Sequence, residues 1–209
     1  DDRTLVIWTA DNSAAPRSRG SNAPFTGYMN SPSEGGMRVP FIARWPGRIP
    51  AGTECTEMAS MMDLLPTFAG LAGVKAPGPD VIDGRDVWPL LAGTPGARTP
   101  HEAFYFYHYD QLQAVRSGAW KLFPPLERQR FGPAVEPRVV NTAPRLYNVV
   151  DDPAEKRDVA AAQPEVVARL TRLAAQGSAE IGDLGRRGRG DRPAGYVLFP
   201  EQQVLPGRK

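Results

Sequence analysis

The sequence predicts an α/β protein in which part of a parallel-sheet domain is followed by a small antiparallel sheet with one helix. Three observations lead to this fold class. Residues 4–9 form a nearly continuous apolar, β-branched run, typical of a strand buried on both faces. Residues 103–149 contain short aromatic or alternating runs, which favour an antiparallel sheet. Residues 164–176 have the apolar spacing of an amphipathic helix.

The strand at residues 4–9 ends at Asp11-Asn12-Ser13, and a second strand is expected at residues 39–45 before the turn Trp45-Pro46-Gly47. In open α/β sheets, ligands bind beyond the carboxyl ends of strands, so Asp11 and Asn12 are well placed for chemistry. Residues 13–37 show no periodicity. A loop of that length is uncommon in a compact domain and is often functional.

One helix is expected in the middle of the chain, over residues 64–72. Asp63 is suited to cap its start, and Gly73 is suited to end it. Residues 77–100 are rich in proline and glycine, with a short apolar patch at residues 87–91. We place a domain boundary near residue 100 for this reason.

The remaining part of the chain has the pattern of a small antiparallel sheet followed by a helix. The helix begins at Pro164 and is expected to end near Gln176, with Gly177 as its last signal. Beyond Ser178 the chain is rich in glycine and arginine and is expected to be weakly structured. The strand candidates are residues 103–109, 113–117, 120–123 and 145–149.

Composition excludes several classes of protein. With 209 residues and 41% hydrophobic content the chain can bury a real core. A net charge of +2 argues against a dedicated nucleic-acid binder. Cys55 is the single cysteine, which excludes an intrachain disulfide and a multi-cysteine metal cage. No apolar run reaches the roughly 18 residues of a membrane span. Because the chain begins Asp-Asp, we expect that the true N-terminus is missing and that the absent signal peptide carries no information.

Five motifs, taken in order, resemble signatures of the sulfatase family and together cover residues 4–175. They are the strand ending in Asp11-Asn12; Glu34-Gly35-Gly36-Met37-Arg38-Val39-Pro40 before Trp45-Pro46-Gly47; Asp63-Leu64-Leu65-Pro66-Thr67 with Leu71-Ala72-Gly73; Asp83-Gly84; and Leu146-Tyr147-Asn148 before Asp152-Pro153-Ala154-Glu155.

The resemblance implies an alkaline phosphatase-like fold and an arylsulfatase-like sulfuric ester hydrolase. Residues 1–100 would be the C-terminal part of the catalytic α/β domain, residues 101–178 a small α+β domain, and residues 179–209 a flexible Gly/Arg-rich tail. The substrate would be a sulfate-ester small molecule or a sulfated glycan, and the location would be periplasmic or extracellular. The residues that bind substrate and the oligomeric state are unknown at this stage, and no nucleic-acid partner or membrane span is expected.

The resemblance also implies calcium as the cofactor, with Asp11 and Asn12 among its ligands. Calcium takes six to eight oxygen ligands, and a carboxylate beside an amide oxygen supplies two of them. The chain alone should therefore hold calcium poorly; by resemblance, two further aspartates and a sulfate oxygen complete the site. The alternative is that Asp11 and Asn12 are a turn pair at a strand end.

No catalytic residue is expected in these 209 residues. The family makes its formylglycine nucleophile in a Cys-x-Pro-x-Arg or Ser-x-Pro-x-Arg motif, and Cys55, followed by Thr56-Glu57-Met58, does not match it. His101 and His108 do not lie in segments that resemble the family's catalytic ones, and we interpret His108 as a satisfied histidine at a sheet edge. We interpret Glu34 and its two glycines as backbone architecture rather than catalysis.

Two positions depart from the family pattern. Ser13 follows Asn12 where members have glycine, and Met29 stands where members place a lysine that contacts sulfate. Either Arg17 or Arg19 substitutes for that lysine, or activity is weaker, or substrate preference has changed. Two rival functions stay open: a phosphodiesterase or phosphonate hydrolase of the same fold, and a non-catalytic or truncated product.

Overall fold

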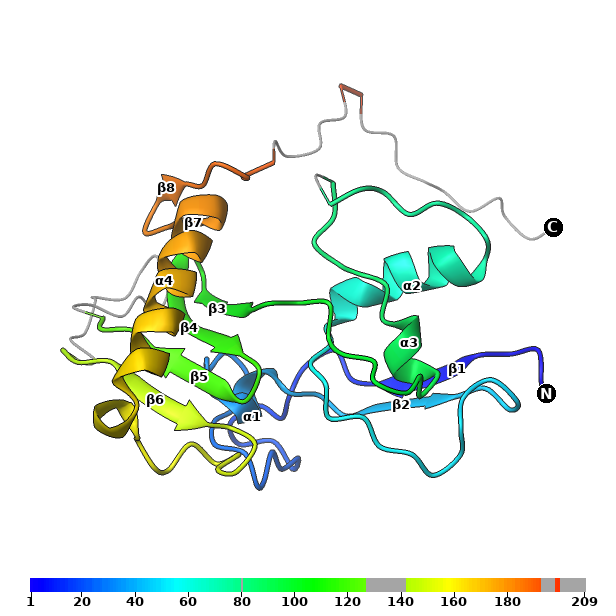
Figure 1. Cartoon of the computed structure of the whole chain (residues 1–209), viewed down its shortest axis with the longest axis horizontal. Coiled ribbons are helices and arrows are strands. Elements are labelled where there is room, and N and C mark those ends of the chain that lie inside the picture. The colour runs from blue at the N-terminus through cyan, green and yellow to red at the C-terminus, as the bar shows by residue number, and fades with distance from the viewer. Residues whose placement is uncertain (80, 127–141, 193–197, 200–209) are drawn as a thin grey trace.

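The computed structural model describes residues 1–79, 81–126, 142–192 and 198–199. Figure 1 shows two parts side by side, one with β1, β2, α2 and α3, and the other with a four-stranded sheet and α4. The chain between β1 and β2, which contains the short helix α1 (Glu34–Met37), reaches across to the four-stranded sheet. The mixed α/β class and the small antiparallel sheet with one helix are confirmed.

The first part is built on two strands that the sequence predicted, β1 (Val6–Thr9) and β2 (Phe41–Arg44). They pair antiparallel, with Val6 opposite Arg44, so the parallel pairing expected for the first strand is corrected. The expected burial of both faces is also corrected, because Val6 is 50% and Trp8 59% exposed. An apolar run predicts that a strand tends to be buried. Among the described residues, the face of β1 that carries Val6 and Trp8 stays exposed, and only the opposite face is covered.

The helix α2 (Leu64–Leu71) covers the face of β1 that carries Ile7, and a hollow of about 390 Å³ lies between the helix and the strand. Its start differs from the prediction: Asp63 makes no cap bond to α2 but belongs to a preceding 3-10 turn, Met61–Asp63, which Ser60 caps. Its end agrees, because Gly73 has a φ of +70° and ends the helix. The apolar patch at residues 87–91 forms α3 (Trp88–Leu91).

The second part is an antiparallel meander of four strands in the order in which they occur in the sequence. All four lie within a residue or two of the expected positions. The helix α4 packs on one face of this sheet, over a core formed by Leu112, Val115, Leu122, Leu146, Leu170, Leu173 and Ala174. The strands are β3 (Phe104–His108), β4 (Gln111–Ser117), β5 (Trp120–Phe123) and β6 (Arg145–Asn148).

The helix α4 (Pro164–Ile181) begins where predicted but continues about a turn beyond the expected end. Gly177 does not end it. A Cβ at Gly177 would lie 2.4 Å from the ring of Tyr105, so glycine lets the helix lie close to β3. The helix ends instead at Gly182, whose φ of +108° favours glycine. A glycine required by packing was therefore misinterpreted as a glycine required by backbone conformation.

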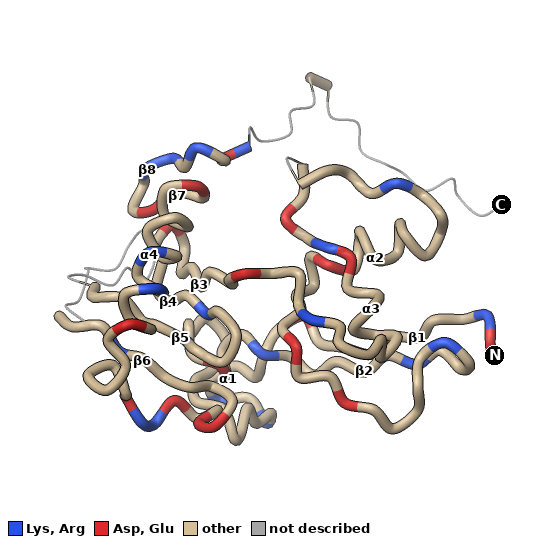
Figure 2. Tube along the Cα trace, in the orientation of Figure 1, with Lys and Arg blue, Asp and Glu red and all other residues tan. Residues whose placement is uncertain are grey.

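The start of the predicted flexible tail is ordered. The short strands β7 (Gly182–Asp183) and β8 (Arg186–Arg187) form a hairpin beside the end of α4. The backbone N–H of Leu184 donates to the carbonyl of Asp110 at 2.7 Å, which fixes this hairpin to the sheet. Basic side chains follow one another along β8 and the residues after it (Figure 2). Residues 193–197 and 200–209 of the predicted tail lie outside the described residues.

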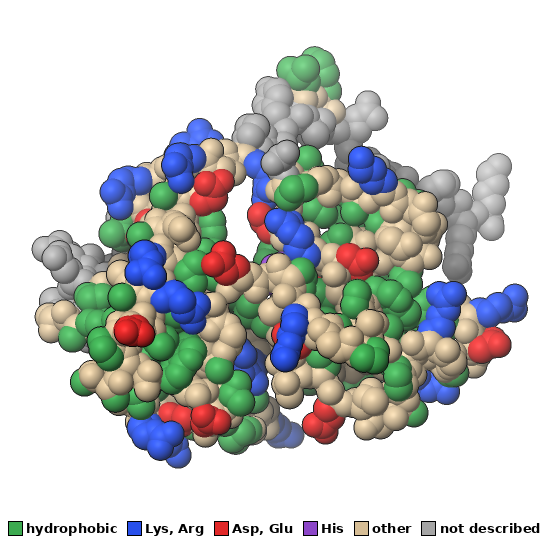
Figure 3. Space-filling model, viewed as in Figure 1, with side chains coloured by type: hydrophobic (Ala, Val, Ile, Leu, Met, Phe, Trp, Pro, Cys, Tyr) green, Lys and Arg blue, Asp and Glu red, His purple; other side chains and the backbone are tan. Residues whose placement is uncertain are grey.

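The described helices include none that combines the length and the apolar composition needed to cross a membrane. The face in Figure 3 carries hydrophobic and charged side chains interspersed over both parts. The predicted domain division at residue 100 stays a prediction. The loop that contains α1 precedes residue 100 in the sequence, but it lies on the four-stranded sheet, which follows residue 100.

Candidate functional site

The carboxyl end of β1 places Asp11 and Asn12 on the surface, where both are exposed. The next residue, Ser13, turns inward and is buried, and its hydroxyl donates to the carbonyl of Gly36 at 3.0 Å. This bond gives a structural reason for the serine that stands where the family has glycine. It also attaches the residue after Asn12 directly to α1.

The long loop predicted to be functional is an ordered segment, residues 13–38, held by one asparagine side chain. Asn22 accepts from the N–H of Ala14 at 2.8 Å and donates to the carbonyls of Ala14 and Gly27 at 3.1 and 3.0 Å. The N–H of Met29 donates to the same Ala14 carbonyl at 3.1 Å. The structure therefore holds the backbone of Met29 at Ala14, two residues after Asn12 in the sequence.

The two glycines of α1 are required by close backbone packing. A Cβ on Gly35 would lie 2.6 Å from the carbonyl oxygen of Thr26, and one on Gly36 would lie 2.1 Å from that of Ser31. Neither glycine has a positive φ. The interpretation of this motif as backbone architecture is confirmed for the glycines.

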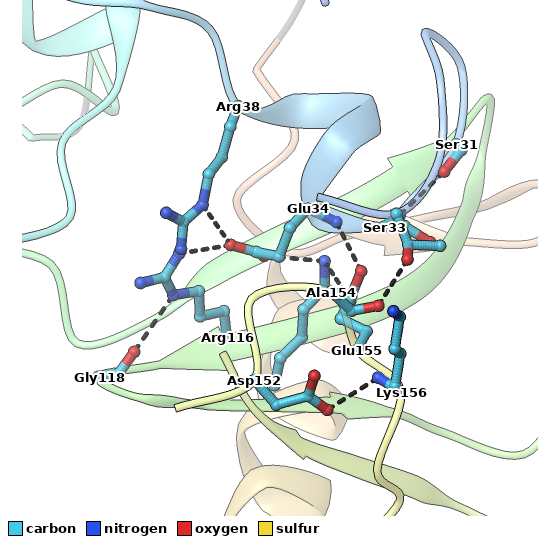
Figure 4. Close-up of polar contacts among 12 residues, drawn as sticks. Ser31, Ser33, Glu34, Arg38, Arg116, Gly118, Asp152, Ala154, Glu155 and Lys156 are labelled. Atoms are coloured by element: carbon cyan, nitrogen blue, oxygen red, sulfur yellow. Dashed lines mark hydrogen bonds and ion pairs between the residues drawn. The ribbon is translucent and has the colours of Figure 1, made fainter. Parts of the chain in front are cut away.

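Glu34, which begins α1, does more than build the backbone. Its side chain is 1% exposed, and its Oε2 accepts from Arg38 at 2.6 Å and from Arg116 at 2.8 Å (Figure 4). Arg116 comes from β4, on the sheet of the second part, and also donates to the carbonyl of Gly118. Glu34 thus joins segment 13–38 to the sheet.

Lys121, from β5, lies between two carboxylates and is fully buried. Its Nζ is 3.0 Å from Oε1 of Glu34 and 3.1 Å from Oε1 of Glu155, and it lies 4.0 Å from the ring centroid of Phe106. The N–H of Glu34 donates to Oε2 of Glu155 at 2.8 Å. We call the five charged residues, Glu34, Arg38, Arg116, Lys121 and Glu155, the buried charge cluster.

The two carboxylates of the buried charge cluster differ in their affinity for protons. Burial raises the pKa of Glu34, but Lys121, Arg116 and Arg38 lower it by more, so that its pKa lies below the ordinary value. Burial keeps the pKa of Glu155 above the ordinary value despite the attraction of Lys121. Burial also lowers the pKa of Lys121. Glu155 is therefore the first of the two carboxylates to be protonated as the pH falls.

The turn that carries Glu155 docks directly on segment 13–38. The hydroxyl of Thr26 donates to the carbonyl of Ala154 at 2.5 Å. Asp152 stabilises the turn by accepting from the N–H groups of Lys156 and Arg157, each at 2.7 Å. Two of the motifs that carried the resemblance, over 100 residues apart in the sequence, therefore meet in space (Figure 4).

Sequence reasoning found both glutamates as parts of motifs but missed Arg116 and Lys121. The available signal was the alternation along β5. Lys121 and Phe123 point to one face and Leu122 to the other, so a lysine occupies a position of the buried pattern. A lysine in that position needs a carboxylate partner, because an unpaired buried charge is costly.

The middle motifs of the sequence meet at Asp63, which is also buried. Its Oδ1 accepts from the N–H of Arg85 at 2.8 Å and lies 2.7 Å from Nε2 of His101, and its Oδ2 accepts from the N–H of Ser60. Gly84 fits because a Cβ there would lie within 2 Å of the Met62 carbonyl, at 1.9 Å. His101 thus has a structural partner.

The predicted calcium ligands are oxygen donors on the surface, which suits a hard cation. Among the described residues, no group of three or more histidine, cysteine, aspartate and glutamate side chains is placed to hold a metal ion. The assignment of Asp11 and Asn12 as calcium ligands stays a prediction. Of the other residues considered for chemistry, His108 packs edge-to-face on Tyr109 with ring centroids 4.8 Å apart, and Cys55 is exposed.

Comparison with known proteins agrees with the arrangement of these motifs. The sequence model of the family described as N-sulphoglucosamine sulphohydrolase, C-terminal, matches residues 28–176. Steryl-sulfatase of Mus musculus is 38% identical over 181 residues, which cover 74% of this chain and 28% of that protein. N-acetylgalactosamine-6-sulfatase of Canis lupus familiaris is 45% identical over 124 residues, which cover 57% of this chain and 23% of that protein.

A similar fold occurs in a solved structure. A sulfatase from Pseudoalteromonas sp. superposes with a TM-score of 0.71 over 85% of this chain and 37% of that one, at 24% identity, which establishes a shared fold. The chain spans about a quarter of the length of the two curated relatives that it matches.

Proposed function

The chain belongs to the sulfatase family, and on this premise we propose that the protein containing it hydrolyses sulfate esters with the help of calcium. The observation that carries the proposal is the meeting of the motifs. Within segment 13–38 the N–H of Met29 donates to the carbonyl of Ala14, two residues after Asn12, and the buried charge cluster joins this segment to the turn that carries Glu155. These are the parts of the chain in which the family resemblance is concentrated.

In this proposal Asp11 and Asn12 hold the calcium ion through a carboxylate and an amide oxygen. When bound, calcium supplies positive charge that attracts a sulfate oxygen and balances charge during hydrolysis. Residues of this chain contribute position: Ser13, which follows Asn12, donates to the carbonyl of Gly36 at 3.0 Å, and the N–H of Met29 donates to the carbonyl of Ala14 at 3.1 Å. The nucleophile has no counterpart among these residues, because Cys55 is exposed and lacks the motif.

The proposed substrate is a sulfate ester of a small molecule or of a glycan. The two curated relatives are named for a sterol and for an amino sugar, so the names favour neither class alone. A periplasmic or extracellular location is proposed from the family resemblance.

The test uses the protein expressed from the complete reading frame that encodes this chain, called the whole-frame protein below. It is assayed on matched aryl sulfate and aryl phosphate esters, with calcium and with a chelator. We expect faster turnover of the sulfate, loss of activity with the chelator, and a large loss in Asp11→Ala. The exposed Asp2→Ala is the matched control and should retain activity.

Met29 favours a second candidate, a phosphodiesterase or phosphonate hydrolase of the same fold, because the position lacks the ammonium that contacts sulfate in relatives. Faster turnover of the aryl phosphate would establish this candidate and reject sulfate-ester hydrolysis. The 209-residue chain by itself is expected to hydrolyse neither ester, since it holds no activated nucleophile. Turnover by that chain, abolished in Asp11→Ala, would contradict this expectation.

A further inference from the structure

We infer that Lys121 and Glu155 are positioning residues: through Glu34, they hold segment 13–38 on the four-stranded sheet and so fix Asp11, Asn12 and Met29 in place. The inference rests on the proposed function only where it assigns those three residues to a reaction site. The contacts from which the positioning is inferred belong to the described residues.

The buried charge cluster lies between separate parts of the chain. Glu34 and Arg38 come from segment 13–38, Arg116 and Lys121 from adjacent strands, and Glu155 from the turn after β6. The contacts at Glu34 are 2.6, 2.8 and 3.0 Å long, and the side chains of Glu34, Lys121 and Glu155 are each at least 97% buried. Water therefore screens these interactions little.

Segment 13–38 meets the four-stranded sheet on the face opposite α4. The face of the sheet opposite α4 carries an aromatic cluster that includes Phe106, Phe123 and Tyr147. Lys121 projects from this apolar face, with its Nζ 4.0 and 5.2 Å from the ring centroids of Phe106 and Phe123. The carboxylates of Glu34 and Glu155 satisfy its charge there, so the sheet face fits the segment in one register.

Hydrogen bonds connect the buried charge cluster to the proposed site. Glu34 begins α1, and the carbonyl of Gly36 in the same helix accepts from Ser13, the residue after Asn12. The N–H of Gly35 donates to the carbonyl of Thr26 at 2.8 Å, and Thr26 donates to the turn of Glu155. A shift of Glu34 would therefore displace the residue next to Asn12.

Positioning explains this arrangement better than stability does. Buried ion pairs are weak support for stability, because the desolvation of the charges offsets much of their attraction. Their directional demands instead disfavour other registers, since a displaced segment would remove Glu34 from Lys121 and Arg116 and leave Lys121 with Glu155 as its one carboxylate partner in the buried charge cluster. The alternative, that the cluster only stabilises the fold, predicts that its loss lowers the melting temperature without a selective effect on segment 13–38.

The experiment compares Lys121→Met and Glu155→Gln with Lys156→Ala in the whole-frame protein. Lys156→Ala removes an exposed lysine next to Glu155 and is the matched control. We expect the amides of Met29 and Gly35 to exchange hydrogen at least tenfold faster in the first two variants. The amide of Leu170, in the core of α4, should be unchanged, and so should both sets of amides in the control.

Activity and calcium titration give the second readout. We expect kcat/KM for the aryl sulfate and the affinity for calcium each to fall at least tenfold in Lys121→Met and Glu155→Gln. The double variant Glu34→Gln with Lys121→Met should lose less than the product of the two single losses, because the two side chains contact each other and their effects are not independent.

Two results would overturn the inference. One is a lower melting temperature with unchanged exchange at Met29 and Gly35, which would make the cluster purely structural. The other is faster exchange with unchanged kcat/KM and calcium affinity. If the wild-type whole-frame protein turns over no sulfate ester, the proposed function fails, and calcium affinity together with exchange then decides the positioning by itself.

Discussion

Met29 is the residue at which the proposed chemistry can be tested most directly. Its backbone N–H is held by the carbonyl of Ala14, so a side chain with a different charge can be introduced without removing this bond. A charged hydrogen bond to an anion contributes about 1.5–3 kcal/mol. We therefore expect Met29→Lys to increase kcat/KM for an aryl sulfate by about 10- to 100-fold in the whole-frame protein.

Met62→Lys is the control, because Met62 is exposed on the 3-10 turn before α2. An unchanged rate in Met29→Lys, combined with a loss in Arg17→Ala or Arg19→Ala, would show that an arginine of segment 13–38 already supplies the charge. Equal loss of turnover in both lysine variants would indicate that the site does not bind a sulfate oxygen at Met29.

Asp63 connects stability to pH at the residue scale. Burial raises its pKa, but hydrogen bonds from His101 and from the N–H groups of Arg85 and Ser60 lower it by more, so that its net pKa lies below the ordinary value. The stability that Asp63 contributes is therefore present above the ordinary aspartate pKa, near 3.9, and is lost as the pH falls through the lower folded-state value.

We expect Asp63→Asn to destabilise the whole-frame protein by roughly 1–3 kcal/mol at pH 7, since buried hydrogen bonds lose a charged acceptor. Thermal melting measured from pH 6 to pH 2.5 should show the difference from wild type becoming smaller below pH 4. Asp86→Asn is the control. A difference that is constant over this range would mean that Asp63 is not ionised in the folded protein.

At the scale of elements, close packing of α4 on β3 makes Gly177 a sensitive position. A Cβ there would lie 2.4 Å from the Tyr105 ring, and overpacking of this kind costs about 1–3 kcal/mol. The gain in helix propensity from alanine, up to about 1 kcal/mol, offsets part of this cost. We therefore expect Gly177→Ala to lower the melting temperature, while Gly70→Ala in α2, where a Cβ meets only ordinary contacts, should not.

Tyr105→Leu in the Gly177→Ala background should recover part of the loss, because the smaller side chain leaves space for the new methyl group. A neutral Gly177→Ala would instead show that α4 moves away from β3 without cost.

The elements differ in how far the sequence predicted them. All six strands with apolar or aromatic runs lie where they were expected, because β-branched and aromatic residues favour extended backbone. The predicted end of α4 was wrong because Gly177 is required for close packing against the ring of Tyr105. That residue is more than 70 positions away, so a local sequence pattern does not contain this contact. The role of Lys121 was missed for the same reason: its partners, Glu34 and Glu155, approach β5 only through long-range packing. Asp11, Asn12 and Met29 were identified through family resemblance, and their roles stay predictions.

At the scale of the whole molecule, one apolar face of the first part lacks a cover among the described residues. Val6, Trp8 and Ile42 lie on the same face of the β1–β2 pair and are 50%, 59% and 60% exposed. Exposed apolar strands of this kind promote association. We expect the 209-residue chain to self-associate when it is expressed by itself.

Ile42→Lys should reduce this association, as measured by light scattering, because a charge on that face must stay hydrated. Val150→Lys is the control, since Val150 is as exposed but lies on the other part of the molecule. A monomeric wild-type chain with a cooperative melt would show that the face needs no cover.

The path of the chain between the two parts has a consequence for cleavage. The chain leaves the first part after β1, lies on the four-stranded sheet as segment 13–38, and returns to form β2 before it enters β3. A protease that cuts the connection between α3 and β3 would therefore not release the two parts, because segment 13–38 still joins them through Glu34. Transfer of residues 101–178 to another protein would likewise separate the buried charge cluster. Arg116 and Lys121 would be transferred without Glu34, the carboxylate that contacts both. The unit that can be exchanged intact includes segment 13–38.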